Sequence, residues 1–483
     1  MAPSTHVPLL PFESFTYPFF DQQYVGDHQA LVRALLAAEN LTFPGDPQQG
    51  NKALYVHIPF CDTLCTFCPF VKSANASRDR VAAYLAALYT ELRTVASTRR
   101  IGQWTLDAVY IGGGTPSVLT VDQITELIAV IRDAFAIAAD AEISFEFEAK
   151  SVDEAKFQAL AELGVTRVSF GVQSFDPSTR GMVNLTASLD QVHAAVDWST
   201  KYFTNTNLDM MVGFPGQNRD AALLDAQVAA TSGIGSVSIY PVDYVMTLPG
   251  WMDKIRRGEL PRPADMGERA AMFHAARAEL LRFMGEQNMY CFGDPTAPPT
   301  KYMFGTLYGG YRDEAVGVGT GAYSVMRGLA YYNDADERTY VQQAGAGELP
   351  VAASMPYHGY EKGLVFWPKR LTFDLADLAV LSLEEALRPR IDALVAEGLA
   401  AVDGTVLRLT EPGKLVYSGL MGYFFSDPQQ RLYHRMVARM DAQVGDVDNL
   451  DWVAGGAGRG RLGALNALPG AATKRRSLTL VPQ

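Results

Sequence analysis

The sequence predicts an α/β protein: a partial (β/α)6 barrel with an N-terminal arm and a small C-terminal winged-helix-like α+β domain. Short β-rich runs alternate with longer segments of helical periodicity from Ala53 to about Val242. Strand–helix alternation over six units indicates a parallel sheet covered by helices. Six units, rather than eight, favour an open barrel. The β-rich runs are 53–59, 107–112, 142–148, 165–172, 206–213 and 235–241, and the helical segments include 80–95, 121–135 and 153–163.

Composition divides the chain into four parts. The beginning is rich in aromatic residues and proline, with one helical stretch near 29–39, which predicts an arm that packs on the main domain. After the last barrel strand a helix is expected at 264–287. Further on, an amphipathic helix pair at 378–398 precedes a hairpin-like Asp403-Gly404, and together they predict a winged-helix-like unit. The expected parts are an N-terminal arm (1–50), a barrel (51–330), a substrate-covering domain (331–450) and a glycine-rich flexible tail (451–483).

The composition is that of an ordinary globular protein, with 48% hydrophobic and 19% charged residues. A net charge of −12 and an isoelectric point near 5.1 argue against a nucleic-acid-binding protein, which normally has a basic surface. We find no apolar run long enough to span a bilayer. Residues 1–6 lack the basic start and apolar core of a signal peptide. The sequence therefore predicts a cytoplasmic protein without nucleic-acid or membrane partners.

The first predicted strand ends in a loop that holds three of the four cysteines, Cys61, Cys65 and Cys68. Three thiolates at C-x3-C-x2-C spacing can bind three irons of a cubane cluster and leave the fourth iron open for chemistry. A disulfide framework is disfavoured because so long a chain has so few cysteines. A zinc site needs four ligands and would require a histidine such as His57, which lies on the strand and alternates away from the loop. The spacing therefore predicts an iron–sulfur cluster.

This loop, with Phe67 before its last cysteine and the string Tyr55–Cys61 before it, resembles the radical S-adenosylmethionine (SAM) superfamily. The string is similar to one branch, the oxygen-independent coproporphyrinogen III oxidase-like proteins, which includes class C methyltransferases, cyclopropane-forming enzymes and anaerobic haem-degrading methyltransferases. The resemblance implies a [4Fe-4S] cluster on the three cysteines, SAM at the open iron, and an electron donor such as flavodoxin or ferredoxin. It also implies that Tyr55 is catalytic together with the cysteines, and that Phe67 contacts SAM.

The ends of the later strands carry the other candidate residues, because barrel active sites lie at the C-terminal ends of the strands. The glycines of Gly112–Thr115 let the backbone approach a ligand closely, although such a run is often only a tight turn. Glu146 shares a strand face with Glu148, and an inward carboxylate needs a partner, either in a structural salt bridge or in SAM. The resemblance implies SAM contacts for Gly112, Gly113, Gly114, Thr115, Glu146, Gln173 and Asp209, and it places Asp243 where relatives close over the nucleoside.

The chain departs from the family pattern in three places. Ala149-Lys150 replaces the usual Asn-Pro or Asp-Pro after the third strand. Leu185 stands where relatives have an arginine for the SAM carboxylate, so either Arg180 substitutes or the carboxylate is recognised differently. Residues 288–293 replace the family's Tyr-Glu-x-Ser-Asn-Phe, which predicts a different substrate. The one cysteine in that segment, Cys291, is expected to be a buried packing residue.

The resemblance suggests a radical SAM enzyme that binds two SAM molecules, because Phe304 and Tyr323 fall where the coproporphyrinogen enzymes contact a second SAM. One SAM would be cleaved to a 5′-deoxyadenosyl radical, and the other would supply a methyl or methylene group to an sp2 carbon. The substrate would be a small aromatic, alkene or tetrapyrrole molecule. A first alternative is oxidative decarboxylation of coproporphyrinogen III, a polyanion that needs several basic residues around it. A second is a haem chaperone without turnover, whose His-Asn-x-x-Tyr-Trp string this chain lacks.

Overall fold

The computed structural model describes residues 17–20, 27–39, 50–242, 244, 249–296, 300–357 and 361–444. Its main feature is a sheet of twelve strands. Six of them are the strands expected from the sequence, and they lie in chain order, each parallel to the next. The predicted α/β fold with a parallel sheet is therefore confirmed. These strands are β1 (Lys52–Ile58), β4 (Thr105–Gly113), β5 (Ala136–Phe147), β6 (Arg167–Gln173), β7 (Asn205–Val212) and β8 (Ser236–Pro241).

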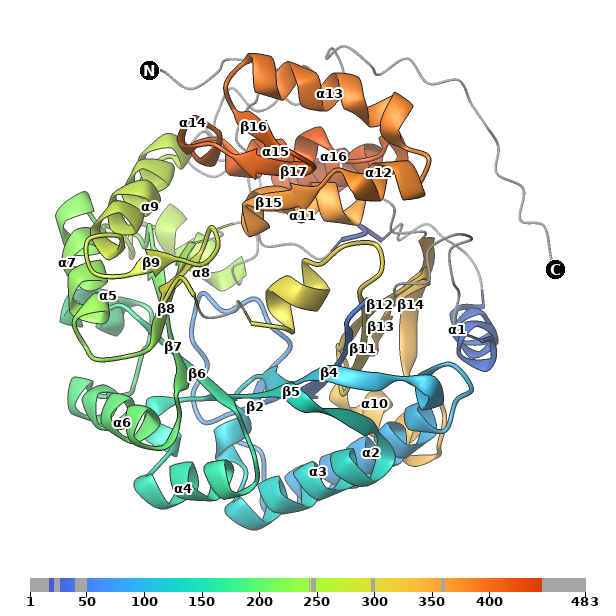
Figure 1. Cartoon of the computed structure of the whole chain (residues 1–483). Coiled ribbons are helices and arrows are strands. Elements are labelled where there is room, and N and C mark those ends of the chain that lie inside the picture. The colour runs from blue at the N-terminus through green and yellow to red at the C-terminus, as the bar shows by residue number, and fades with distance from the viewer. Residues whose placement is uncertain are drawn as a thin grey trace.

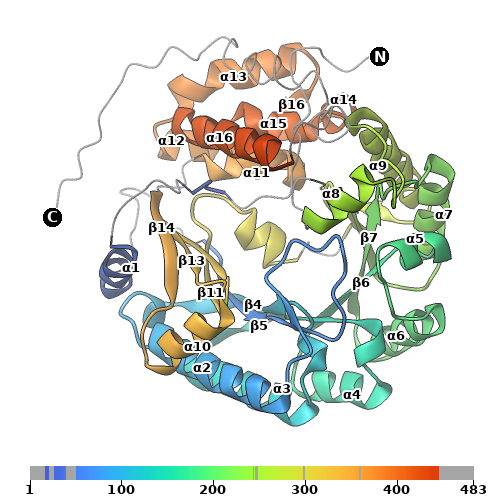
Figure 2. The same ribbon diagram turned by 180° about the vertical axis from the view of Figure 1, so that it is seen from behind.

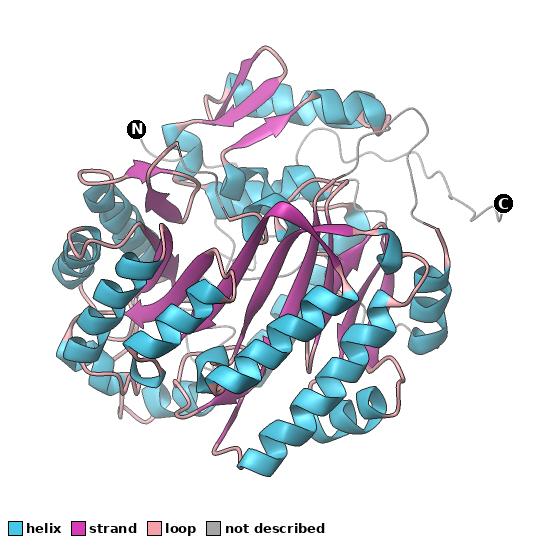
Figure 3. Ribbon diagram, turned by 60° about the horizontal axis from the view of Figure 1, so that its bottom comes forward, coloured by secondary structure: helices cyan, strands magenta, loops and turns pink. Residues whose placement is uncertain are grey.

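Helices connect these strands and cover the outer face of the curved sheet (Figures 1 and 3). Polar side chains define the helix starts: Thr120 with Gln123, and Ser188 with Gln191, form capping boxes that satisfy backbone N–H groups. Short 3-10 turns lie at Ile101–Gln103, Pro116–Val118 and Ala149–Ser151. The helices are α2 (Arg78–Ala96), α3 (Val121–Ala134), α4 (Glu154–Glu162), α5 (Pro177–Met182), α6 (Leu189–Tyr202) and α7 (Arg219–Ala230).

The sheet continues beyond the six expected strands at both edges. Strand β11 (Glu314–Val318) lies parallel to β1 on the side opposite β4, and three antiparallel pairings extend the sheet from β11 to β14. At the other edge two short antiparallel strands follow β8. The strand order runs from β14 to β9 and is open. The added strands are β9 (Gly285–Glu286), β10 (Cys291–Gly293), β12 (Tyr323–Met326), β13 (Gly328–Asn333) and β14 (Val351–Tyr357).

Two sequence expectations need correction here. The helix expected at 264–287 is α9 (Met266–Leu280), which ends earlier because Gly285 and Glu286 pair with β10 as strand β9. The boundary expected at residue 330 falls inside β13, so the sheet runs past it. The division of the chain into parts otherwise remains a prediction. The expected tail, 451–483, lies outside the described residues, as does most of the arm.

A small C-terminal unit lies against one end of the curved sheet (Figure 1). It holds a three-stranded sheet in the order β15-β17-β16. Its hairpin turns at Gly404, which has a φ of +61°. In the described part of the chain, no helix has the length and apolarity needed to cross a bilayer. The unit contains α11 (Lys362–Arg370), β15 (Thr372–Asp374), α12 (Ala376–Val380), α13 (Glu384–Ala396), β16 (Ala400–Asp403), β17 (Val406–Leu409), α14 (Glu411–Lys414), α15 (Tyr417–Tyr423) and α16 (Asp427–Val444).

The described part of the N-terminal arm packs between the large sheet and the C-terminal unit. The Tyr17 carbonyl accepts a hydrogen bond of 2.8 Å from the Tyr323 hydroxyl, and the Tyr17 hydroxyl donates one of 2.8 Å to Glu361 Oε1. The Phe19 ring lies edge-on against Phe425, with 5.2 Å between ring centroids. These contacts join three segments that are far apart in sequence. The remaining elements are α1 (His28–Ala37), β2 (Phe60–Cys61), β3 (Ser73–Ala74), α8 (Pro249–Arg256), a π-helix (Met303–Leu307) and α10 (Glu337–Gly345).

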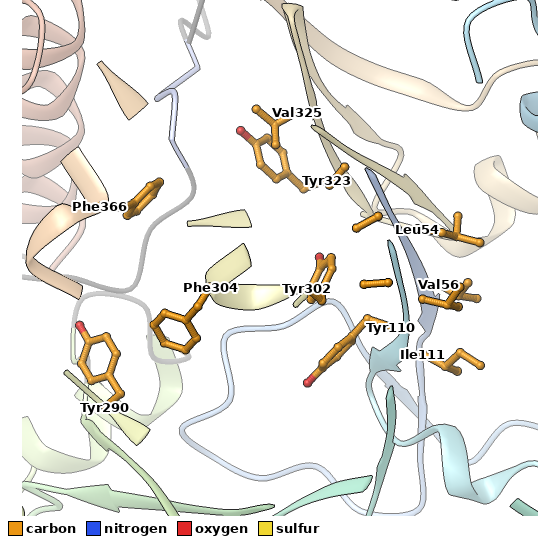
Figure 4. Packing of buried hydrophobic residues seen from close by; sticks show 14 of the residues in the cluster. Leu54, Val56, Tyr110, Ile111, Tyr290, Tyr302, Phe304, Tyr323, Val325 and Phe366 are labelled. Atoms are coloured by element: carbon orange, nitrogen blue, oxygen red, sulfur yellow. The ribbon is translucent and has the colours of Figure 1, made fainter. Parts of the chain in front are cut away.

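The two faces of the sheet carry different residues. Along a strand, successive side chains point to opposite faces. Leu54, Val56 and Ile111 are fully buried on one side, and Tyr110 points to the other (Figure 4). The inner face, where Tyr110 lies, carries the polar and aromatic groups of the candidate site.

Candidate active site

The cysteine loop begins at β2 and is closed by the parallel pairing of β2 with β3. Figure 2 shows this loop, in blue, within the curve of the sheet. Its three cysteines are unpaired and partly exposed, and their thiols lie within electrostatic range of one another. Burial, followed by the neighbouring Cys68, raises the pKa of Cys65 to about 12. A bound cation is therefore needed to keep this thiol ionised at neutral pH.

These thiols fit a cluster better than a single ion. In the described residues, no three His, Cys, Asp or Glu side chains come together around one point as a single metal ion requires. In a cubane cluster each thiolate binds a different iron, so the thiols need not converge on one point. His57 does not complete a zinc site, because its Nε2 donates to the Val71 carbonyl at 2.8 Å and its Nδ1 accepts from Tyr55 at 2.9 Å.

Side chains from neighbouring strand ends hold the cysteine loop in place. The Asn184 amide donates to the Leu64 carbonyl at 2.9 Å. Lys150 Nζ donates to Thr63 Oγ1 at 2.8 Å and to Thr186 Oγ1 at 2.7 Å. Lys150, which departs from the family pattern, thus ties the third strand end to the loop. No motif or residue spacing indicates these bonds.

The Phe67 ring anchors the loop from the apolar side. It packs edge-on against Phe214, which follows β7, with 5.5 Å between centroids. Leu185 and Cys65 border the same small apolar cluster. The position that holds an arginine in relatives therefore faces the cysteine loop here as an apolar contact.

The glycines at the end of β4 allow two backbone segments and one carboxylate to approach closely. A Cβ on Gly112 would lie 2.5 Å from Glu146 Oε2, and a Cβ on Gly114 would lie 2.7 Å from the Pro59 backbone. The Gly114 amide donates to the Ile58 carbonyl at 2.8 Å. The strand end is thus bound to the start of the cysteine loop, and no residue larger than glycine fits. The next residue, Thr115, donates its hydroxyl to Cys61 Sγ at 3.4 Å.

We expect Gly113→Ala to lower the free energy of unfolding by about 3–5 kcal/mol, because it adds steric overlap to backbone strain. Gly113 has a φ of +116°, and a Cβ there would lie 2.7 Å from the His57 ring. Gly398→Ala is the control, since Gly398 has a φ of +73° but no atom within 4 Å. Its loss should be only about 1–2 kcal/mol. Denaturant titration measures both, and equal losses would contradict the close packing of Gly113 on His57.

Glu146 is half-buried on the inner face and bound by two donors. Tyr110 Oη donates to its Oε1 at 2.5 Å, and the Gly113 amide donates to its Oε2 at 3.0 Å. Burial raises the pKa of this carboxyl, while both bonds lower it. The carboxylate is therefore fixed in orientation before any ligand binds. This arrangement suits a ligand that carries a positive charge, which would lower the pKa again.

Gln173 and Asp209 lie at the next two strands. Gln173 has a φ of +67° at a register shift in β6, a conformation rare for residues other than glycine. Its side-chain amide makes no hydrogen bond with the described residues, so its donor and acceptor are open. Asp209 is half-buried and accepts from Asn207 Nδ2 at 2.9 Å and from Ser169 Oγ at 3.2 Å. Burial raises its pKa. Asp243 lies outside the described residues.

Three tyrosines stack on the inner face beside Glu146. Tyr302 lies against Tyr55 with 5.6 Å between centroids and against Tyr110 with 4.7 Å. Figure 4 shows Tyr302 beside Tyr110. Tyr110 could have been found from sequence, because its two-residue spacing from Gly112 puts it on the same strand face. Tyr302 lies outside the regular strands, and nothing in its spacing indicates this contact.

The two residues expected at a second SAM lie at the edge of this aromatic group. Phe304 is buried in the π-helix, with its ring edge-on to Tyr308 at 5.5 Å. Tyr323 is buried on β12 and donates its hydroxyl to the Tyr17 carbonyl. Its hydroxyl is thus already engaged by the arm. A role for both in SAM binding stays a prediction.

Arg180 is engaged elsewhere, although we expected that it could replace the missing arginine at Leu185. Its guanidinium donates to the carbonyls of Val172 at 3.1 Å and Ser174 at 2.9 Å, and also to that of Ala187. These three bonds occupy it in shaping the loop after β6. We therefore favour the other alternative, in which the carboxylate is recognised differently.

Comparison with known proteins identifies the class. A sequence profile of the radical SAM superfamily matches residues 55–226. The heme chaperone HemW of Mycobacterium tuberculosis is 30% identical over 391 residues, which cover 77% of this chain and 93% of that protein. An oxygen-independent coproporphyrinogen III oxidase of Bradyrhizobium diazoefficiens is 25% identical, over 81% of this chain and 91% of its own length. The anaerobilin synthase of Escherichia coli O157:H7 is 26% identical, over 77% and 83%.

A solved structure shows the same fold. Coproporphyrinogen III oxidase (HemN) from Escherichia coli superposes with a TM-score of 0.68 over 85% of this chain and 96% of that one, at 22% identity. The chain therefore belongs to the radical SAM superfamily, in the branch that contains HemW and the oxygen-independent coproporphyrinogen III oxidases. Membership implies a [4Fe-4S] cluster and SAM.

Proposed function

We propose that this radical SAM protein is an enzyme that uses two SAM molecules and transfers a methyl or methylene group to an sp2 carbon. Its substrate would be a small aromatic, alkene or tetrapyrrole molecule, and its electrons would come from a flavodoxin or ferredoxin. The relatives have three different named activities, so membership of the branch does not choose among them.

The observation that carries the proposal is the stack of Tyr55, Tyr302 and Tyr110 beside Glu146. Flat aromatic faces offer a planar sp2 substrate a large apolar contact area. The inner face also holds the half-buried carboxylates of Glu146 and Asp209, and burial raises the pKa of both. Such a surface suits a substrate with few negative charges better than a polyanion, because like charges in a buried site repel strongly.

In this proposal the chain binds, orients and excludes water. Cys61, Cys65 and Cys68 would hold the cluster, which with SAM supplies radical chemistry when bound. Glu146, fixed by Tyr110 and Gly113, would accept hydrogen bonds from an amino group of SAM. The tyrosine stack would orient the substrate and keep water away.

Tyr55 would keep its proton in this scheme. The Nε2 proton of His57 goes to the Val71 carbonyl, so Nδ1 is the acceptor for the Tyr55 hydroxyl. Burial lowers the pKa of His57 to about 4, and this keeps the imidazole neutral at neutral pH. The Tyr55 hydroxyl is thereby held in one direction, as positioning of a reactive substrate requires.

Oxidation of coproporphyrinogen III is the second candidate. Similarity to an oxidase over 81% of this chain favours it. Leu185 and the segment 288–293 count against it, because they alter the residues that the branch uses near SAM and substrate. A product that has lost carbon dioxide, without methyl transfer, would support this activity.

A haem chaperone is a further alternative, since HemW is among the relatives. The chain lacks the His-Asn-x-x-Tyr-Trp string of those proteins. Tight stoichiometric binding in a haem titration, together with no SAM turnover, would favour this role over the enzyme.

The deciding experiment is anaerobic incubation of the reconstituted protein with reductant, methyl-deuterated SAM and candidate porphyrin and heteroaromatic substrates, read by mass spectrometry. We expect both 5′-deoxyadenosine and S-adenosylhomocysteine, with one deuterium moved into deoxyadenosine. Deoxyadenosine alone would contradict methyl transfer for the substrates tested.

A further inference from the structure

Arg167 is a buried cation whose guanidinium has no hydrogen bond or ion pair with the described residues. It begins β6, is 6% exposed, and lies level with Ser144 of β5. Ser169, two residues further along β6, donates a hydrogen bond to Asp209 on the inner face of the sheet. Residues two apart on a strand lie on the same face, so Arg167 also lies on the inner face. Its Nη1 is buried without a hydrogen bond, and no bond or ion pair joins its guanidinium to any described residue.

Other buried arginines of the described chain are all bonded. Each one donates to a carbonyl or a carboxylate, as a buried charge normally must. Arg167 is the exception among them. The bonded ones are Arg100, which pairs with Glu314 at 2.5 Å; Arg180, on three carbonyls; Arg269, on the Ala264 carbonyl; and Arg277, on Glu286 and Glu411.

The carboxylates near Arg167 form no ion pair with it in the described structure. Burial lowers the pKa of Arg167, but the negative charges of Glu142 and Asp209, which lie within electrostatic range, outweigh burial and raise this pKa overall. Neither is within 4.0 Å as an ion pair, and both already have other donors. Glu142 accepts from Ser144, Thr300 and the Lys301 amide, and Asp209 accepts from Ser169 and Asn207.

We propose that Arg167 is a carboxylate-binding subsite inside the barrel. A guanidinium presents a planar fork of donors that matches a carboxylate, and such charge-assisted pairs are strong in a buried site. The carboxylate belongs to a small molecule, either the substrate or the amino-acid end of a SAM molecule. This choice of ligands rests on the proposed function.

Cys291 provides a second position at which the subsite can be tested. It lies opposite Ser238 on β10, and Ser238 in turn lies opposite Asp209 on β7. The thiol is within electrostatic range of Arg167. A glutamate at this position would place a carboxylate where it can reach the guanidinium. The carboxylate introduced by Cys291→Glu should therefore pair with Arg167 and block ligand binding at the subsite.

The test measures affinity in the reconstituted holoprotein without reductant, so that nothing turns over. The probes are SAM, 5′-methylthioadenosine, which lacks the amino-acid carboxylate, and coproporphyrin III. The variants are Arg167→Gln and Cys291→Glu. Their matched controls are Arg282→Gln, at an exposed arginine, and Cys291→Ser. The controls should bind all probes like the unaltered protein.

The pattern of loss identifies the source of the carboxylate. If SAM supplies the carboxylate, both test variants lower the affinity for SAM about tenfold or more and leave the affinity for methylthioadenosine unchanged. If the substrate supplies it, coproporphyrin III weakens by a similar factor and SAM does not. Unchanged affinity for SAM and for coproporphyrin III in both test variants overturns the subsite. Failure of the unaltered protein to bind either of these two probes overturns it as well.

The outcome is separable from that of the proposed function. Methyl transfer with unchanged affinities in Arg167→Gln contradicts the subsite alone. Weakened binding in Arg167→Gln, in a protein whose unaltered form makes only 5′-deoxyadenosine, contradicts methyl transfer alone.

Discussion

The triple variant Cys61→Ala, Cys65→Ala, Cys68→Ala should be purified colourless, with iron at background and no cleavage of SAM. The three thiols lie on one loop within electrostatic range of one another, and thiolates are the ligands of such clusters. Loss of the cluster removes the radical chemistry altogether, so 5′-deoxyadenosine should fall below detection. Iron analysis and the visible spectrum of the anaerobically reconstituted protein measure this directly.

Cys291→Ala is the matched control. Cys291 is the fourth cysteine and lies buried on β10, away from the loop. It should retain the iron and the colour of the unaltered protein. If the triple variant kept its iron, or if Cys291→Ala lost it, the assignment of the ligands would be wrong.

Glu146→Gln should weaken SAM binding by about 100-fold and slow deoxyadenosine formation to match. The change removes a charge that is held by Tyr110 and Gly113 and would face an amino group. A buried charge-assisted bond is worth about 1.5–3 kcal/mol, which is a factor of roughly 10 to 150. Tyr110→Phe should give an intermediate loss, because it removes one of the two donors that orient the carboxylate.

The control for a buried carboxylate is Glu142→Gln. Glu142 is on the same strand and face, but its oxygens are occupied by Thr300 and the Lys301 amide. This variant should lose stability, through its broken bonds, without losing affinity for SAM. Equal weakening by Glu142→Gln and Glu146→Gln would show that the effect is a general disturbance of β5.

The six central strands were predictable because each is a short β-rich run between segments of helical periodicity. The outer strands were missed for a physical reason. β9 and β10 are only two and three residues long, and β12 and β13 form where Tyr323 and its neighbours pair with a segment close by in sequence. Such pairing depends on a neighbour and not on the segment's own composition.

The site was predictable where spacing carries the chemistry. The three cysteines and the glycine run follow strands, and strand ends meet at one edge of a parallel sheet. In the structure the Gly113 amide donates to Glu146, while the SAM contacts expected of both residues stay predictions. Arg167 could not be predicted as unpaired, because its exceptional feature is the absence of a bond. Glu142 and Asp209 accept hydrogen bonds from their own strands and also from Thr300, the Lys301 amide and Ser169, which belong to other segments.

The position of β1 between β4 and β11 has a consequence for how the protein is made. β4 follows β1 within about fifty residues, but β11 is reached only at Glu314–Val318. Until that part of the chain has been synthesised, the strand that leads into the cysteine loop has one open edge, with unpaired backbone groups. Pairings this distant in sequence form slowly. A nascent chain arrested before Glu314 should therefore expose β1 to proteases and chaperones, and a stable cluster should form only after release of β11.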